Sequence, residues 1–273
     1  MDIITSNLLA LLGNELYAHT HIIAPLSPFK WHRLLAQADI HHVADYVHDA
    51  ILNLLRKQPE VLEGTTLKDW NTDWYRMSVE HSAKYKPDEN IFATRKQRMR
   101  YTDILSEHVE KRDTTPETMR LFRMLTANSM EMLNSGFCMR GLLQMGKFLR
   151  EDGDKVDYVM LEQDLAMMGV TSLSSLQGSM LIQLFDFTED EIPFLGDMKP
   201  SAGALALRCI VRPERYSSDE WSFRQGTHGL LANNPRQWVR GLRRTSLYFR
   251  YAPGESVSTL FSRVVRSLSE IEE

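Results

Sequence analysis

The chain has few cysteines, no long apolar run and almost no alternating apolar pattern. Only two cysteines, Cys138 and Cys209, occur among its 273 residues, far apart and in apolar surroundings. Two buried free thiols are therefore expected, a disulfide is disfavoured, and no C-x-x-C pair exists for metal or redox chemistry. No apolar run approaches the roughly 18 residues of a membrane-spanning helix. The start of the chain carries an acid rather than a basic leader, so we expect no signal peptide and a cytoplasmic protein.

Strand patterns and phosphate-binding loops are also missing. No alternating run of five or more β-forming residues is bounded by hairpin turns, and no Gly-rich loop or Ser/His/Asp arrangement is present. Helical spacing dominates instead. Between residues 28 and 55, apolar side chains recur at i, i+3, i+4 and i+7, namely Val43, Tyr46, Val47, Ala50, Ile51 and Leu54. This spacing predicts one long amphipathic helix that ends before Pro59.

The same reasoning along the chain predicts an all-α multi-helix bundle of about nine to eleven helices with little or no sheet. Further helices are expected at about 67–84, 90–112, 117–133, 137–150, 157–169, 172–185 and 200–212, then from Asn234 and over 254–270. The apolar composition of 117–133 on all sides indicates a central, buried helix. We divide the chain into an N-terminal helical region, 1–113, and a C-terminal helical region, 114–273, which can pack as one continuous domain.

Several segments resemble a known family. Residues 26–52 and 116–200, with the runs Gly136-Phe137-Cys138-Met139-Arg140, Val156-Asp157-Tyr158 and Ile192-Pro193-Phe194, are similar to the helical flanks of an uncharacterised nucleotidyltransferase-like family common in Bacteroidales. The resemblance implies a catalytic palm between the flanks, where two acids on one strand bind Mg²⁺. Here the segment between the flanks has helical spacing. The nearest substitute, Gly178-Ser179 followed by Asp190-Glu191, would place its two acids on opposite faces of a strand.

Two clusters of polar residues are candidate binding sites. His41, Asp45 and His48 share one face of the predicted helix at i, i+4 and i+7, a spacing that can hold Zn²⁺. A solvated outer face is the favoured explanation, because no further ligand is visible nearby, so no metal site is expected. A second pair, His19 and His21, is the weaker candidate, because alternate residues converge only on extended backbone and the surroundings read as helical.

Arginines gather near the C-terminal end of the chain. Residues 201–273 carry a net charge of +4 against −8 for the rest, and no acid occurs between Trp221 and Gly254. On a helix, Arg236, Arg240, Arg243 and Arg244 would lie on one face, followed by Arg250. Guanidinium groups suit phosphate and carboxylate, so this face is a candidate site for an anion or a protein partner. Intramolecular pairing with the acidic remainder of the chain is the alternative.

The favoured hypothesis is a non-catalytic, all-helical protein that acts through protein–protein association, with a partner or with a second copy of itself. No cofactor is expected, and nucleic acid is not expected either, because the net charge is −4 and no reading motif occurs. Two alternatives stay open. One is an enzyme related to the nucleotidyltransferases or dependent on a metal ion at a rebuilt site, and the other is a module that binds polyanions through the arginine-rich helix.

Overall fold

The structure, a computed structural model, describes residues 1–57, 73–85, 92–111, 114–212, 242–243, 245–254 and 256. Within these ranges it contains no strand and ten α-helices of ten or more residues. They are α1 (Ile3–Leu16), α2 (Pro28–Ile40), α3 (Ala44–Lys57), α5 (Asp73–Lys84), α6 (Arg95–Lys111), α7 (Pro116–Asn134), α8 (Met139–Asp152), α9 (Tyr158–Met168), α10 (Thr171–Phe185) and α11 (Ala202–Val211), with short 3-10 turns at Gly153–Lys155 and Pro193–Leu195. The predicted all-α bundle is confirmed. Among the described helices, none has the length and apolar character needed to cross a membrane.

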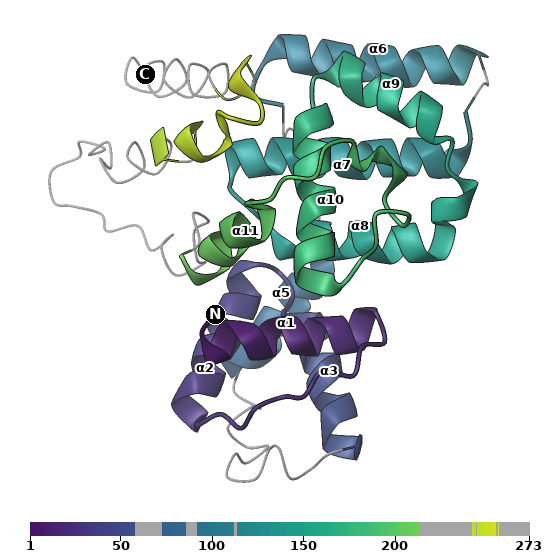
Figure 1. The fold of residues 1–273 in the computed structure, drawn as a ribbon. Helices are drawn as coiled ribbons and strands as arrows, with labels where there is room; N and C mark the ends of the chain where they lie inside the picture. Colours follow the sequence, from purple (N-terminus) through teal and green to yellow (C-terminus); the bar gives the residue numbers. More distant parts are fainter. Residues whose placement is uncertain are drawn as a thin grey trace, which may run out of the picture.

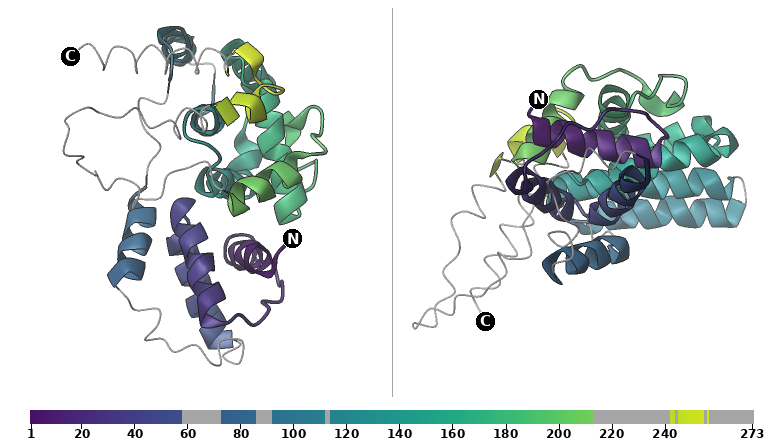
Figure 2. Two further views of the ribbon diagram at one scale, coloured as in Figure 1. Left: turned by 90° about the vertical axis from the view of Figure 1, so that its left-hand side faces the viewer. Right: turned by 90° about the horizontal axis from the view of Figure 1, so that it is seen from below.

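The helices form two groups (Figure 1). Helices α1, α2, α3 and α5 pack against one another and make the N-terminal lobe, whereas α6 to α11 make the C-terminal lobe. The side view in Figure 2 keeps the two lobes apart, with α1 facing α10 and α11 across the junction. Helix α6 packs against α9. In packing, the two groups divide between α5 and α6. The division of the chain at residue 113 stays a prediction.

Side-chain and backbone caps explain where several helices begin and end. The carboxylate of Asp2 accepts hydrogen bonds from the backbone of Ile4 and Thr5 at the start of α1. Asp157 caps α9 through the N–H of Met160, and Gly169 ends that helix with a left-handed backbone, both as predicted. A serine cap at Ser172 or Ser174 is the N-cap expected for α10 from the sequence, and this was wrong, because the N-cap is Val170 and the helix begins at Thr171.

The spacing of Thr188 and Glu191 just before Pro193 is that of a capping box and predicts a helix start, but the motif is only partly realised. The N–H of Thr188 donates to the Glu191 carboxylate at 2.8 Å, as that motif requires. However, only the short 3-10 turn Pro193–Leu195 follows, because Gly196 takes a positive φ of 57° with a ψ of −118°. The helix start expected at Pro193 is therefore absent.

The single helix expected over residues 28–55 is broken in two. His42 has a φ of 54°, and the N–H of Val43 bonds to the carbonyl of Ala38 at 2.8 Å. This bond spans six residues, from Ala38 to Val43, and follows a residue with a left-handed backbone. The combination is the Schellman motif, which ends a helix. The apolar stripe of α3 is nevertheless buried as predicted, with Val43 and Val47 fully inside. The helix break matters for function, because it places His41 at the end of α2 and leaves Asp45 and His48 on α3.

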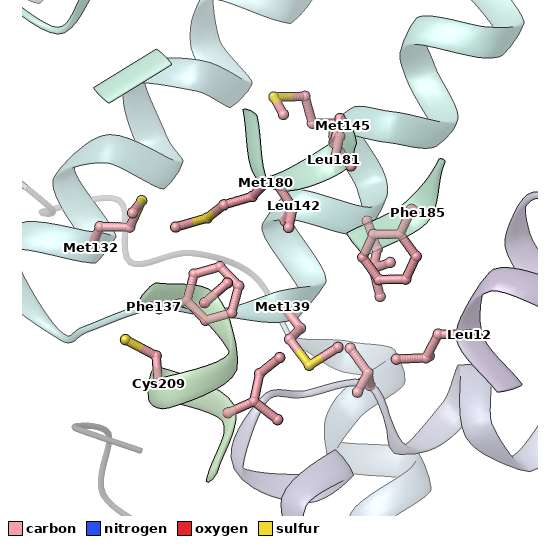
Figure 3. Packing of buried hydrophobic residues seen from close by; sticks show 14 of the residues in the cluster. Leu12, Met132, Phe137, Met139, Leu142, Met145, Met180, Leu181, Phe185 and Cys209 are labelled. Atoms are coloured by element: carbon pink, nitrogen blue, oxygen red, sulfur yellow. The ribbon is translucent and has the colours of Figure 1, made fainter. Parts of the chain in front are cut away.

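The core runs continuously through the junction of the lobes. Figure 3 shows Leu12 of α1 facing Met139 and Phe185 of the C-terminal lobe, and Cys209 beside Phe137. Both cysteines are buried and free, as expected from the sequence. Methionine is unbranched and flexible, so it fills the irregular gaps that arise where helices cross at differing angles. The lobes therefore share one apolar core, and their relative position is held mainly by this packing.

Candidate metal centre

Two histidines and an aspartate converge at one edge of the lobe junction. His19 and His21 follow α1, and Asp186 follows α10. His19 Nδ1 lies 3.2 Å from His21 Nε2, which in turn lies 3.4 Å from a carboxylate oxygen of Asp186. Each residue offers one ligand atom, and all three atoms lie within 4.8 Å of one another. Within the described residues, this is the group of histidine, cysteine and acidic side chains whose geometry suits a metal ion.

These separations fit a tetrahedral ion. Zinc binds imidazole nitrogen at about 2.0–2.1 Å and carboxylate oxygen at about 2.0–2.2 Å, which places neighbouring ligand atoms roughly 3.3–3.6 Å apart. The distances of 3.2 Å between the two imidazoles and 3.4 Å between His21 and Asp186 are close to that range. The third pair of ligand atoms, on His19 and Asp186, lies within 4.8 Å.

The backbone after α1 explains why the two histidines face the same way. Ala18 has a φ of 55°, which ends the helix, and the segment up to α2 is not helical. The side-chain amide of Asn14 then fixes the backbone of His21. It donates to the carbonyl of His21 at 2.8 Å and accepts from the N–H of His21 at 2.8 Å. The expectation that these histidines do not converge was therefore wrong, because it assumed a helical context.

Gly13 provides the space that His19 occupies. A Cβ atom at this position would lie only 2.9 Å from His19 Nδ1, the proposed ligand atom. The N–H of His19 also bonds to the Gly13 carbonyl at 3.3 Å. The imidazole therefore packs directly against the helix backbone, and its position depends on the missing side chain.

Asp186 is presented by the end of α10. It is the C-cap residue, with a left-handed backbone of φ 54° that aspartate tolerates better than most residues. Its side chain is 72% exposed. The carbonyl end of a helix carries partial negative charge. A carboxylate there is therefore in a weakly unfavourable place for an anion, and a cation bound to it gains from both charges.

The local charges favour the neutral form of His19. Burial lowers its pKa from the usual 6.5, and the neighbouring His21 and Arg150 lower it further, against the opposite influence of Asp186 and Glu191. Neutral imidazole is the form that ligates metals, so a lowered pKa reduces the competition from protons.

Aromatic and charged side chains support the centre from the C-terminal lobe. The Arg150 guanidinium lies over Phe187, 4.0 Å from the ring centroid, and over Tyr17 at 5.0 Å. Its Nε donates to Glu191 at 2.8 Å. Partial burial would raise the pKa of Glu191, but hydrogen bonds from Thr188 and Arg150 hold it below the usual value. The charge of Arg150 is thus partly balanced by the Glu191 carboxylate, which reduces its repulsion of a bound cation.

The histidine cluster predicted from the sequence does not come together. His41 caps α2 and is fully buried beside Phe137, with ring centroids 5.8 Å apart. Asp45, on the next helix, accepts two bonds of 2.9 Å from Arg140 Nη1. His48 Nδ1 lies 2.8 Å from the hydroxyl of Tyr75. The break at His42 removes the shared helix face, and each side chain has its own partners.

Arg140 also differs from expectation. Helical spacing over 137–150 puts Arg140 opposite the apolar face and so predicts an exposed side chain, yet its side chain is only 8% exposed. Besides Asp45, it donates to the carbonyl of His42 at 2.9 Å and lies 4.8 Å from the centroid of the Tyr46 ring. The residue is therefore a buried link between the lobes, a role that helical spacing alone does not reveal.

The predicted arginine face lies mostly outside the described residues. Arg236, Arg240 and Arg244 are not described, while Arg243 and Arg250 are exposed. The anion-binding and partner-binding role of these five residues stays a prediction.

Two spaces inside the described structure lie away from the three ligands. One, of about 10 Å³, lies beside Asn128, Glu131 and Gln177, and has room for about one water molecule. The other is an open groove of about 440 Å³ between α1 and α11. Neither is lined by His19, His21 or Asp186.

No protein-family model matches the chain, and no curated protein or solved structure is significantly similar to it. The resemblance to the nucleotidyltransferase-like family therefore stays a prediction.

Proposed function

We propose that this all-helical protein binds one divalent transition-metal ion, Zn²⁺ in the first instance, through His19, His21 and Asp186. The observation that carries the proposal is the spacing of the ligand atoms, which is 3.2 Å between the imidazoles of His19 and His21 and 3.4 Å between His21 and Asp186. Two imidazoles and one carboxylate suit zinc and its neighbours in the first transition row, whereas calcium and magnesium prefer oxygen ligands alone.

A binding role is favoured over a catalytic one. Three protein ligands leave a coordination position for water, as catalytic zinc sites do, and the same ligand types hold iron in some oxygenases. However, the His21 side chain is 47% exposed and that of Asp186 72% exposed. Metal catalysis gains from a shaped cavity that excludes water, and these exposures place the centre at the surface. The sequence-based expectation of a non-catalytic protein is compatible with such a centre.

Isothermal titration of the metal-free full chain with ZnCl₂ tests the proposal. We expect saturable binding of one ion per chain, weakened about 100-fold or more by His21→Gln, since even the loss of a residue that only orients a ligand reduces metal affinity 10- to 100-fold. The matched control is His32→Gln, which alters an exposed histidine on α2 outside the centre. Absence of saturable binding up to about 1 mM free zinc, the weakest affinity of interest, would overturn the proposal. Equal loss in the control would do the same.

Self-association is a second candidate function, and the outward face of α9 favours it. Val159 is 70% exposed and Met167 51% exposed, and Glu162, Gln163 and Ala166 are exposed on the same face. A face with exposed apolar side chains can pair with its own copy across a two-fold axis. Light scattering after gel filtration should show a dimer that Met167→Lys dissociates. A monomer at every concentration would exclude this candidate.

A further inference from the structure

We infer that the metal ion is a clasp between the two lobes, so that its binding controls how tightly they dock. This inference rests on the proposed metal-binding function. The observation behind it is the origin of the ligands. His19 and His21 belong to the segment that leaves α1 of the N-terminal lobe, whereas Asp186 ends α10 of the C-terminal lobe. An ion bound by all three is therefore coordinated across the junction.

The histidine segment is already anchored at its base to the C-terminal lobe. The hydroxyl of Tyr17 donates to the carbonyl of Leu143 at 3.0 Å, and its ring meets Phe185 and Phe187 edge-on. Gly146 makes this approach possible, because a Cβ there would lie 2.5 Å from the Tyr17 hydroxyl. The two histidines thus arrive at Asp186 in a defined position, and the entropy cost of assembling the centre is reduced.

Besides the Tyr17 hydroxyl on the Leu143 carbonyl, two side-chain links cross the junction away from the three ligands. Arg140 of α8 pairs with Asp45 of α3, and the hydroxyl of Tyr85, after α5, bonds to Glu131 of α7. Without an ion, the contact between His21 and Asp186 is an exposed pair of the kind that contributes little. The metal centre is therefore the link across the junction that solution conditions can switch on and off.

The size of the effect follows from linkage. When the lobes separate, the ion loses Asp186 and keeps only the two histidines. An ion that binds the docked form alone reduces the open population about 100-fold when the free ion is at 100 times its Kd. The effect shrinks as residual binding to the open form grows. A purely local site on His19 and His21 would instead leave the opening equilibrium unchanged.

Hydrogen exchange with mass spectrometry on the full chain, with ZnCl₂ or with EDTA, tests the clasp. In the wild type we expect zinc to slow exchange at least ten-fold in residues 17–27. We expect the same at the far side of the junction, in the second turns of α3 and α8, whose amides are hydrogen-bonded within their helices and whose first turns meet through Asp45 and Arg140.

Asp186→Asn is the decisive variant, because asparagine also tolerates the left-handed backbone and is a poor metal ligand. With zinc raised above the weakened Kd of the variant, it should keep zinc protection within residues 17–27 and lose it around Asp45 and Arg140. The matched control is Asp190→Asn, an exposed acid on the same loop, which should behave as the wild type.

Zinc protection confined to residues 17–27 in the wild type would overturn the clasp while leaving metal binding intact. Protection around Asp45 that persists in Asp186→Asn would also overturn it. A failure to bind zinc in the titration is a separate result, which would overturn the proposed function itself.

Discussion

Two segments of the N-terminal lobe carry most of its histidines, and their surroundings differ. The segment at 19–21 is irregular, partly exposed and faces a carboxylate from the other lobe. The segment at 41–48 surrounds a helix break, and its polar groups are engaged by Arg140, Tyr75 and the aromatic rings beside them. The first segment has ligand atoms that face one another, whereas the second uses its polar atoms in contacts within the N-terminal lobe and, through Arg140, with the C-terminal lobe.

The difference shows that a local density of metal-binding residue types is a poor guide to a metal site. A ligand must be accessible and must converge with others, and a side chain committed to a buried network satisfies neither condition. Convergence depends on backbone geometry. Gly13 and the left-handed Ala18 allow it in one segment, while the left-handed His42 prevents it in the other.

The largest effect is expected at Asp45, in the second segment. Replacing it with alanine leaves the nearly buried guanidinium of Arg140 without its carboxylate. Removing one partner of a buried pair commonly costs about 3–5 kcal/mol, because a charge then stays desolvated and uncompensated. We expect the free energy of unfolding to fall by an amount at the lower end of this range, since the Asp45 side chain is 15% exposed. Urea unfolding of Asp45→Ala measures it, and a change below about 1 kcal/mol would contradict a structural role.

The converse prediction concerns the first segment. Changing His19 and His21 together to glutamine should abolish measurable zinc binding but alter the unfolding free energy of the metal-free protein by less than about 1 kcal/mol, as for exposed polar contacts. His48→Gln should leave zinc affinity unchanged. In the wild type, zinc at 100 times its Kd should stabilise the fold by about 2.7 kcal/mol. If His48→Gln weakened zinc binding as strongly as the double variant, the distinction between the segments would fail.

These expectations show which parts of the molecule were predictable. The all-α class followed from apolar spacing, and α9 could be bounded because Asp157 and Gly169 mark its two ends. Such signals are local, since a cap involves residues within one turn of each other. The long-range features lacked any such signal. Nothing near Arg140 in the sequence indicates that it meets Asp45, and nothing near His21 points to Asp186.

The helix break at His42 was missed for a related reason. Apolar spacing continues through Val43 into α3, and no glycine, asparagine or proline marks the left-handed residue. Histidine pays a steric cost in this conformation. Two tertiary contacts hold His42 in this conformation. His41 packs against Phe137, and Arg140 donates to the carbonyl of His42. The convergence of His19 and His21 was not predicted either, because no residue type marks the left-handed Ala18 that ends α1 before them.

A smaller effect is expected from Gly13→Ala, which separates ligand geometry from stability. The new Cβ would crowd His19 Nδ1 at 2.9 Å and displace the ring. We expect zinc affinity to fall about 10-fold, the lower end of effects from residues that orient ligands. Alanine also favours the helix by up to about 1 kcal/mol over glycine, so thermal unfolding of the metal-free variant should not fall sharply. Unchanged zinc affinity would show that the contact with Gly13 does not position His19.

The smallest effect is a pH dependence that His19 confers on the metal-free protein. Burial lowers its pKa in the folded state, so the unfolded chain binds a proton at a higher pH than the folded one. By linkage, stability then rises with pH across that interval and is lost as the pH falls below the usual histidine value of about 6.5. Unfolding free energies of wild type and His19→Gln, compared between pH 7.5 and pH 5, measure the difference. The variant should lose less stability on acidification, and an equal or greater loss would mean that His19 is not held in its neutral form, which would remove one of the arguments for its role as a ligand.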